Sequence, residues 1–129
     1  MKPSDVSVVI PAINEQDSIQ SSIRSAFAAG ATDVIVSDGG SKDRTRMIAA
    51  ELGVSKIVRS LPGRGIQQNS GALLAEREFI LFLHADSLLG EHCLEQICEN
   101  ADATWGAFRQ RIDRPKILYR TIETGNACR

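Results

Sequence analysis

Three short apolar runs, each ending in a polar turn, most constrain how this chain can fold. They occupy residues 6–10, 34–36 and 79–83, and a weaker run occupies residues 54–59. Apolar runs without polar alternation are typical of strands buried on both faces, as in a parallel sheet covered by helices. The carboxyl ends of parallel strands meet at one edge of the sheet, where α/β proteins bind their ligands. The residues that follow each run are therefore the first candidates for a functional site.

Helical patterns separate these runs. Ile19, Ile23 and Phe27 recur at four-residue spacing, and we expect this helix to have Asn14 as its N-cap and to stop at Gly30. Further helices are expected over residues 41–52, 66–75, 91–98 and 116–124, and a further strand over residues 104–112. The alternation predicts an α/β fold with a doubly wound, mainly parallel sheet between two layers of helices.

Bulk properties limit the classes of function. The 129 residues suffice for a single domain, residues 1–129, with one core. A net charge of −1 offers no basic surface for nucleic acid, and no apolar run reaches the roughly 18 residues that span a bilayer. Cys93, Cys98 and Cys128 lack the spacing of a metal site, so we expect free thiols and a cytoplasmic location.

The turn after the first run contains Pro11, Asn14 and Glu15. One interpretation is a loop that wraps a nucleoside, with Pro11 shaping its wall and Glu15 accepting a hydrogen bond from the ribose or base. The other is helix capping alone, with Asn14 as the N-cap and two acidic residues, Glu15 and Asp17, favourable in the first turn. The sequence leaves both interpretations open.

The second run ends in a turn that begins with Asp38 and Gly39. Asp38 is expected to accept a hydrogen bond from an N–H group of uracil or a similar base. Gly39 and Gly40 would let a ligand approach the backbone closely. The alternative is an Asx turn in which Ser41 is the N-cap of the next helix.

A glycine-rich segment, residues 63–71, places Arg64 between two glycines. A guanidinium there can meet a diphosphate with two parallel hydrogen bonds. The segment is neither a Walker A sequence nor the dinucleotide fingerprint, and an exposed turn is its simpler interpretation.

His84 and Asp86 follow the last of the three runs. Alternate residues on a strand end face the same side, so these two can address one cation together. A carboxylate and an imidazole suit Mn²⁺ or a similar divalent ion. The alternative is an aspartate that caps the next turn beside a half-buried histidine.

Taken together, these motifs resemble the family 2 glycosyltransferases with the GT-A fold, a Rossmann-like α/β/α architecture. The resemblance is closest to a small bacterial branch with His-Ala-Asp in place of Asp-x-Asp. The segments that carry it are residues 6–15, 36–45, 63–71 and 82–86, with residues 106–113 and 119–126 in support.

The resemblance implies a role for each motif. The nucleoside of a nucleotide-sugar would be held by Pro11, Glu15 and Asp38. Arg64 would lie near its diphosphate. Asp86 would bind Mn²⁺ or Mg²⁺, with His84 as a further ligand or a ribose contact. The full set of implied nucleotide-binding residues is Pro11, Asn14, Glu15, Asp38, Gly39, Arg64 and Asn69.

Two departures from the family pattern matter. His84 replaces an acidic residue, which removes one negative charge from the metal site. Family members also continue well past residue 129, so we expect the GT-A domain to be truncated on its C-terminal side and to lack the acceptor pocket. Asp113 and Glu123 do not fall on the family's base motif, which leaves the catalytic residues unassigned.

The leading hypothesis is therefore a metal-dependent glycosyltransferase that moves a sugar from a nucleotide-sugar, with UDP favoured, to an unknown acceptor. One alternative is a non-catalytic nucleotide-binding or assembly module with the same fold. A nucleotidyltransferase is disfavoured because residues 11–15 are neither glycine-rich nor basic. Peripheral membrane association stays open, as does self-association through an exposed sheet edge at residues 104–112.

Overall fold

The computed structural model describes residues 2–100, 102 and 105–107. The chain divides into two compact units, Met1–Glu99 and Asn100–Arg129, and all helices and strands of the described residues lie in the first. Residues 105–107 have no regular structure, and the rest of the strand expected over 104–112 lies outside the described residues, as does the helix expected over 116–124. A single domain over residues 1–129 stays a prediction.

The first unit alternates strands with helices, as the sequence predicts. The strands are β1 (Val6–Ala12), β2 (Asp33–Asp38), β3 (Lys56–Arg59) and β4 (Phe79–Phe82). The helices are α1 (Ile19–Ala28), α2 (Thr45–Glu51), α3 (Arg64–Ala72) and α4 (Cys93–Glu99), preceded by a short 3₁₀ helix, η1 (Pro3–Asp5). No helix is expected from the sequence at the position of η1, which packs against α4.

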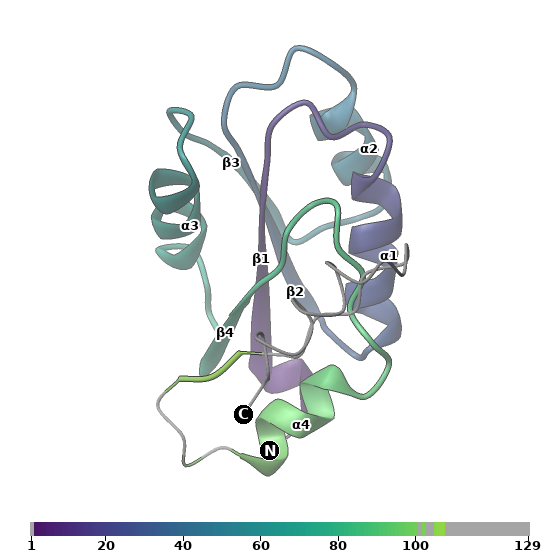
Figure 1. Ribbon diagram of the computed structural model, residues 1–129, viewed down its shortest axis with the longest axis vertical. Coiled ribbons are helices and arrows are strands. Elements are labelled where there is room, and N and C mark those ends of the chain that lie inside the picture. Colours follow the sequence, from purple (N-terminus) through teal and green to yellow (C-terminus); the bar gives the residue numbers. More distant parts are fainter. Residues whose placement is uncertain (1, 101, 103–104, 108–129) are drawn as a thin grey trace, which may run out of the picture. The chain divides into compact units, whose positions relative to one another are not determined.

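The four strands form one parallel sheet in the order β3-β2-β1-β4 (Figure 1). In the register, Val9 of β1 lies between Ile35 of β2 and Phe82 of β4. The chain builds the sheet outward from β1 to β3 and then returns to place β4 on the other side of β1. The winding direction therefore reverses between β1 and β4.

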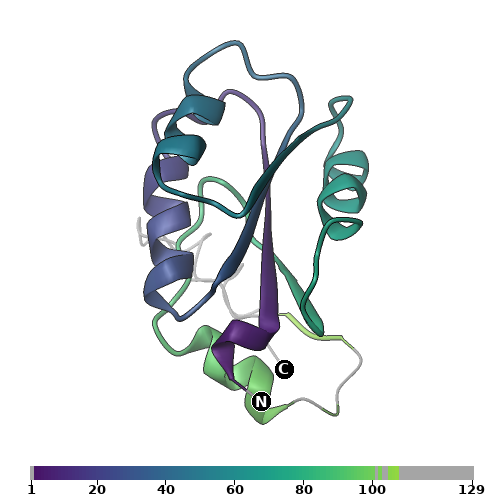
Figure 2. The ribbon, with the colours of Figure 1, turned by 180° about the vertical axis from the view of Figure 1, so that it is seen from behind.

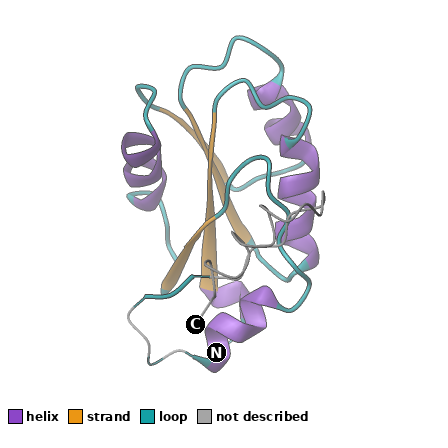
Figure 3. Cartoon of the chain, in the orientation of Figure 1, coloured by secondary structure: helices purple, strands orange, loops and turns teal. Residues whose placement is uncertain are grey.

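Helices cover both faces of this sheet. Figures 1 and 2 show α1 and α2 on one side and α3 on the other, and Figure 3 shows the strands between them. On the α3 side, the helix packs against β1, β2 and β3. The three-layer α/β/α architecture expected from the sequence is confirmed.

Burial separates the central strands from the edges. Every residue of β2 is buried, as is every residue of β1 except the half-buried Pro11. In β4 the burial alternates, and Ile80 and Phe82 each keep 42% of their surface exposed. These two residues share the sheet face on which α3 lies, but that helix does not extend over β4. Among the described residues, β4, which corresponds to the apolar run at residues 79–83, is therefore an edge strand rather than a strand buried on both faces.

The helix after β1 begins later than the sequence suggests. Its N-cap is Ser18, four residues beyond the expected Asn14. Asn14 has a φ of 51°, the left-handed region that asparagine tolerates, and a helix cannot begin there in that conformation. Ile19 and Ile23 are fully buried as expected. The helix stops as predicted, with Gly30 at a φ of 104° just beyond its C-cap.

The next helix also begins late. α2 starts at Thr45, so Ser41 is not its N-cap, and the hydroxyl of Ser41 binds Asp38 instead. Ala49 of this helix is buried, and Ile48 and Leu52 are half-buried.

α3 lies unusually close to the sheet because Gly71 has no side chain. A Cβ atom built there would lie 2.4 Å from the Cγ1 atom of Val9, well inside van der Waals contact. It would also lie 3.5 Å from the Cβ atom of Ser37, an ordinary contact. Gly71 therefore sets the distance between α3 and strands β1 and β2.

A buried carboxylate joins the amino ends of the strands. The hydroxyl of Ser7 donates to Asp33 at 2.6 Å, and the Glu76 backbone N–H donates to the same oxygen at 3.4 Å. Burial acts to raise the pKa of Asp33, but the hydrogen bonds from Ser7, Glu76 and Ser55 and the charge of Lys56 outweigh it, so the pKa lies below its ordinary value. Asp33 therefore holds β1, β2 and the segment before β4 together in its ionised form.

Candidate functional site

A hollow of about 330 Å³ lies at the carboxyl edge of the sheet, beside the point where the winding reverses between β1 and β4. Open α/β sheets bind ligands at this reversal, because the connections leave the two strand ends in opposite directions and open a crevice. The residues that line it are Pro11, Ala12, Ile13, Glu15, Gly63, Arg64, Gln67, His84, Ala85 and Asp86.

Three separate segments of the chain supply this lining: the end of β1, the start of α3 and the turn after β4. Five of the nine residues singled out from the sequence belong to it, namely Pro11, Glu15, Arg64, His84 and Asp86. The remaining four, Asn14, Asp38, Gly39 and Asn69, do not line it.

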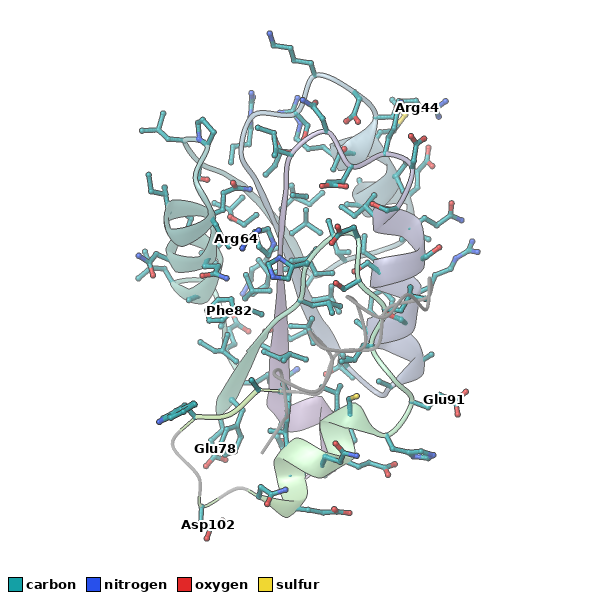
Figure 4. All side chains as sticks on the ribbon, viewed as in Figure 1. Arg44, Arg64, Glu78, Phe82, Glu91 and Asp102 are labelled. Atoms are coloured by element: carbon teal, nitrogen blue, oxygen red, sulfur yellow. The ribbon has the colours of Figure 1, made fainter. Side chains whose placement is uncertain are left out.

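Two charged groups of the lining have side chains without partners. Neither the Arg64 guanidinium nor the Asp86 carboxylate has an ion pair or side-chain hydrogen bond within the described part of the chain. Both residues are exposed. Figure 4 shows Arg64 between α3 and the sheet. A guanidinium and a carboxylate on the same hollow, neither neutralised by another described residue, are available to a ligand.

Asp38 has a different place from the one expected. It is fully buried, and its Oδ2 atom accepts hydrogen bonds from the backbone N–H groups of Gly40 and Ser41, each at 3.0 Å. Its Oδ1 atom accepts from the Ser41 hydroxyl, and the Arg46 guanidinium lies 3.8 Å from Oδ2. The Asx turn that the sequence offered as an alternative is present. Contact between Asp38 and a base stays a prediction.

The loops after β1 and β2 are tied together by side chains. The Asn14 backbone N–H donates to the Ser41 hydroxyl at 2.9 Å, and the Asn14 side-chain oxygen accepts from the Lys42 N–H at 2.8 Å. Asn14 therefore fixes the position of one loop against the other rather than capping a helix.

A second tie lies beside Glu15. Its backbone N–H donates to the Thr45 hydroxyl at 2.9 Å, and the Gln16 N–H donates to Asp43 at 3.2 Å. A hydrogen bond from the Thr45 hydroxyl is the main reason that the pKa of Asp43 lies below its ordinary value. The carboxylate of Glu15 accepts from Ser18 at 3.0 Å, so the entry to α1 orients it.

The turn that contains His84 and Asp86 is anchored on α1. β4 ends at Phe82, and the Ser87 N–H donates to the His84 carbonyl at 3.0 Å to close a turn. The buried hydroxyl of Ser22 donates to the same carbonyl at 3.1 Å. His84 and Asp86 both line the hollow, but a turn places them there and not the alternation of a strand.

Gln67 is a polar residue of the lining that the sequence did not single out. It is 5% exposed, and its amide bonds to the end of β1, the end of β2 and the residue before α3. Its neighbour Gln68 carries the same side chain and has no such bonds, so residue type alone gave no signal. The glycine-rich segment around it was the nearest indication.

The donor atoms for a metal are few. Among the described residues, no three His, Cys, Asp or Glu side chains are grouped as a metal site would require. Cys93 and Cys98 are free thiols, and Cys128 lies outside the described residues. His84 and Asp86 can thus supply at most part of a coordination shell.

The described part of the chain contains no helix with the length and apolar character needed to cross a bilayer.

Known proteins are similar to this chain in sequence. A transferase named for undecaprenyl-phosphate 4-deoxy-4-formamido-L-arabinose, from Klebsiella pneumoniae (strain 342), is 34% identical over 146 aligned positions. That alignment covers 95% of this chain and 45% of the relative, so this chain spans less than half of that protein's length.

Solved structures share the fold. Staphylococcus aureus TarS, residues 1–349, superposes with a TM-score of 0.71 at 21% identity, covering 91% of this chain and 38% of the other. Mycobacterium tuberculosis glucosyl-3-phosphoglycerate synthase, in complex with Mn²⁺, UDP and glucosyl-3-phosphoglycerate, gives a TM-score of 0.56 at 27% identity, covering 62% and 33%. The α/β fold of this chain is the GT-A fold.

The match to a family model covers most of the chain. It runs from residue 7 to residue 123 and therefore includes every segment that lines the hollow. This chain belongs to glycosyl transferase family 2.

Proposed function

We propose that this chain carries the donor site of a glycosyltransferase, which binds a nucleotide-sugar together with a divalent cation and transfers the sugar to an acceptor. The observation that carries the proposal is the hollow at the winding reversal, where Arg64 and Asp86 lie without partners in the described part of the chain. The complex of the mycobacterial synthase with Mn²⁺ and UDP supports it, because that protein has the same fold.

The charges of the lining support a cation as part of the ligand. Glu15 and Asp86 contribute two negative charges and Arg64 one positive charge. A nucleoside diphosphate brings further negative charge, and close like charges repel strongly where water is partly excluded. A divalent cation bound with the diphosphate would make the net charge of these side chains and the cation positive, so that the diphosphate is attracted. Metal-free binding is therefore expected to be weak.

The residues present fit such a cation. Asp86 offers a carboxylate without a partner among the described residues, and His84 offers an imidazole. Diphosphate oxygens and water would complete the shell of an ion such as Mn²⁺ or Mg²⁺. A partial protein shell suits an ion that arrives with its nucleotide. When bound, the ion would supply Lewis-acid stabilisation of the departing nucleoside diphosphate.

The remaining lining residues would hold the nucleotide. Arg64 would make two parallel hydrogen bonds to phosphate oxygens, because its guanidinium is exposed and unpaired among the described residues. Pro11 and Glu15 would form the wall beside the nucleoside. Direct roles for the four predicted residues outside the lining, Asn14, Asp38, Gly39 and Asn69, stay proposals.

Calorimetric titration tests the donor site. The chain is titrated with UDP, GDP, ADP and CDP, each with Mn²⁺ and with EDTA. We expect one nucleotide to bind with Mn²⁺ and to bind at least tenfold more weakly with EDTA. Binding of none of them under either condition would reject the donor site.

A charge-matched pair of variants localises the metal. Asp86→Asn removes one negative charge from the lining, and Glu91→Gln removes one near the start of α4, away from the hollow (Figure 4). We expect Asp86→Asn to abolish the Mn²⁺ dependence and Glu91→Gln to leave it unchanged. Equal effects of the two variants would contradict a metal site at Asp86.

Transfer itself needs a separate assay. The assay measures the nucleoside diphosphate that is released when the sugar is hydrolysed or transferred from the bound donor. Binding without release would favour the alternative of a nucleotide-binding module, while release would establish catalysis by this chain.

A further inference from the structure

We propose that Gln67 is a positioning residue of this site, whose buried amide holds the start of α3, and with it Arg64, against the ends of β1 and β2. The inference rests on the proposed function, because it assigns Arg64 to the diphosphate of the bound nucleotide.

The amide of Gln67 is fully used by three partners. Its Nε2 atom donates to the backbone carbonyls of Ala12 at 2.9 Å and Ser37 at 3.2 Å. Its Oε1 atom accepts from the backbone N–H of Gly63 at 3.2 Å. Both amide hydrogens and the carbonyl oxygen thereby connect three segments that are far apart in the sequence. With 5% of the residue exposed, water cannot readily replace these bonds.

Arg64 depends on this connection. It follows Gly63 directly and begins α3, and its own side chain has no partner among the described residues that could fix its position. The segment from Leu61 to Gly65 is exposed. The Gln67 amide joins the backbone beside Arg64 to the ends of β1 and β2. Loss of the amide would leave the guanidinium present but free to move away from the diphosphate.

A substitution at Gly39 offers a second way to perturb the amide of Gln67. A Cβ atom at Gly39 would lie 2.8 Å from Cδ, 2.9 Å from Oε1 and 3.0 Å from Nε2 of Gln67. The backbone of Gly39 is not in the left-handed region, so alanine is allowed there by conformation. An alanine at this position would therefore displace the Gln67 amide without changing Gln67 itself.

The first experiment compares Gln67→Met with Gln68→Met. Methionine keeps the length of the side chain and removes its hydrogen bonds, and Gln68 is the neighbouring residue of the same helix, outside the lining. Affinity is measured with Mn²⁺ for the nucleoside diphosphate that the unmodified chain binds most tightly in the panel above, and for the corresponding nucleoside.

We expect Gln67→Met to weaken binding of the diphosphate about tenfold, which is the cost of one hydrogen bond to a charged group. Affinity for the nucleoside should change less than twofold, and Gln68→Met should change neither. Equal weakening of both ligands would indicate a structural role only and would overturn the proposal. Unchanged binding of both ligands would overturn it as well.

A double-mutant cycle tests whether the effect passes through Arg64. If Gln67 acts by positioning Arg64, then Arg64→Met should weaken diphosphate binding in the unmodified chain and have little further effect in the Gln67→Met chain. Additive effects would overturn the proposal. Gly39→Ala should reproduce the selective loss of diphosphate binding. If Gln67→Met does not fold, Gly39→Ala takes its place in the double-mutant cycle with Arg64→Met.

The design separates two kinds of failure. If the unmodified chain binds no nucleotide of the panel, the proposed function fails and the inference fails with it. If the unmodified chain binds a nucleoside diphosphate and Gln67→Met binds it equally well, the inference alone fails and the donor site stands.

Discussion

Replacing Gly71 by alanine tests the close contact between α3 and the sheet. The added methyl group would lie 2.4 Å from Cγ1 of the fully buried Val9, more than 1 Å inside ordinary contact. Val9 belongs to a central strand and cannot move aside without disturbing both neighbouring strands. Either α3 shifts outward or the strand distorts.

The magnitude follows from two opposing terms. Alanine is favoured over glycine within a helix by about 1 kcal/mol. Overpacking of a well-packed core costs about 1 to 3 kcal/mol, and so severe an overlap belongs near the upper value. The net expectation is a loss of about 2 kcal/mol in the free energy of unfolding, or roughly 10 °C in Tm for a unit of this size.

Chemical denaturation with urea, followed by circular dichroism, measures this loss. Gly65→Ala is the matched control, because a Cβ atom there meets nothing within 4 Å, and we expect it to be neutral or slightly stabilising. Val9→Ala should destabilise the chain alone but restore part of the stability lost in Gly71→Ala, since it removes the methyl group that the new one meets. A Gly71→Ala chain as stable as the unmodified one, or no rescue by Val9→Ala, would refute the reasoning.

Two further predictions concern other contacts. The folded-state pKa of Asp33 is lowered, so its ionised form stabilises the fold above about pH 4, its ordinary value, and this contribution is lost as the pH falls through the folded-state pKa. Asp33→Asn should therefore lower stability by about 1 kcal/mol at pH 7 and flatten the pH dependence of Tm below pH 4; an unchanged acid transition would contradict it. Ser22→Ala removes the hydroxyl that anchors the His84 carbonyl and should weaken Mn²⁺-dependent nucleotide binding several-fold, whereas Ser21→Ala, on the exposed side of α1, should not. Equal affinities of these two variants, measured by calorimetry, would contradict an anchoring role.

The strands and helices of the described residues could largely be predicted from the sequence. Continuous apolar runs require burial on both faces, and the helical patterns between them leave a parallel sheet as the simplest solution. The bounds were less certain at the carboxyl ends. β1 and β2 extend to Ala12 and Asp38, two residues beyond the expected end of each run, because the backbone pairing of the two strands continues there.

Helix starts were predicted less well than helix stops. Gly30 ends α1 as expected, since a local property of glycine, its tolerance of positive φ, decides it. Asn14 was expected to cap a helix, and the same use of Ser41 was the alternative to a ligand-binding turn. The two residues instead bond to each other across 27 residues of chain. A capping residue and a residue that ties two loops have the same side chains, so local sequence could not distinguish the two uses.

By itself, then, the sequence determined the fold class, the family and the edge of the sheet at which function should lie. These depend on hydrophobic periodicity and on short motifs, both of which are properties of neighbouring residues. Only the tertiary structure decided which polar groups stay free for a ligand. The carboxylate of Asp38 accepts hydrogen bonds within its own turn. Arg64 and Asp86 are unpaired in the described part of the chain. Gln67 bonds to Ala12, 55 residues away. Whether a polar side chain is free depends on partners that folding brings to it, and the sequence nearby does not specify them.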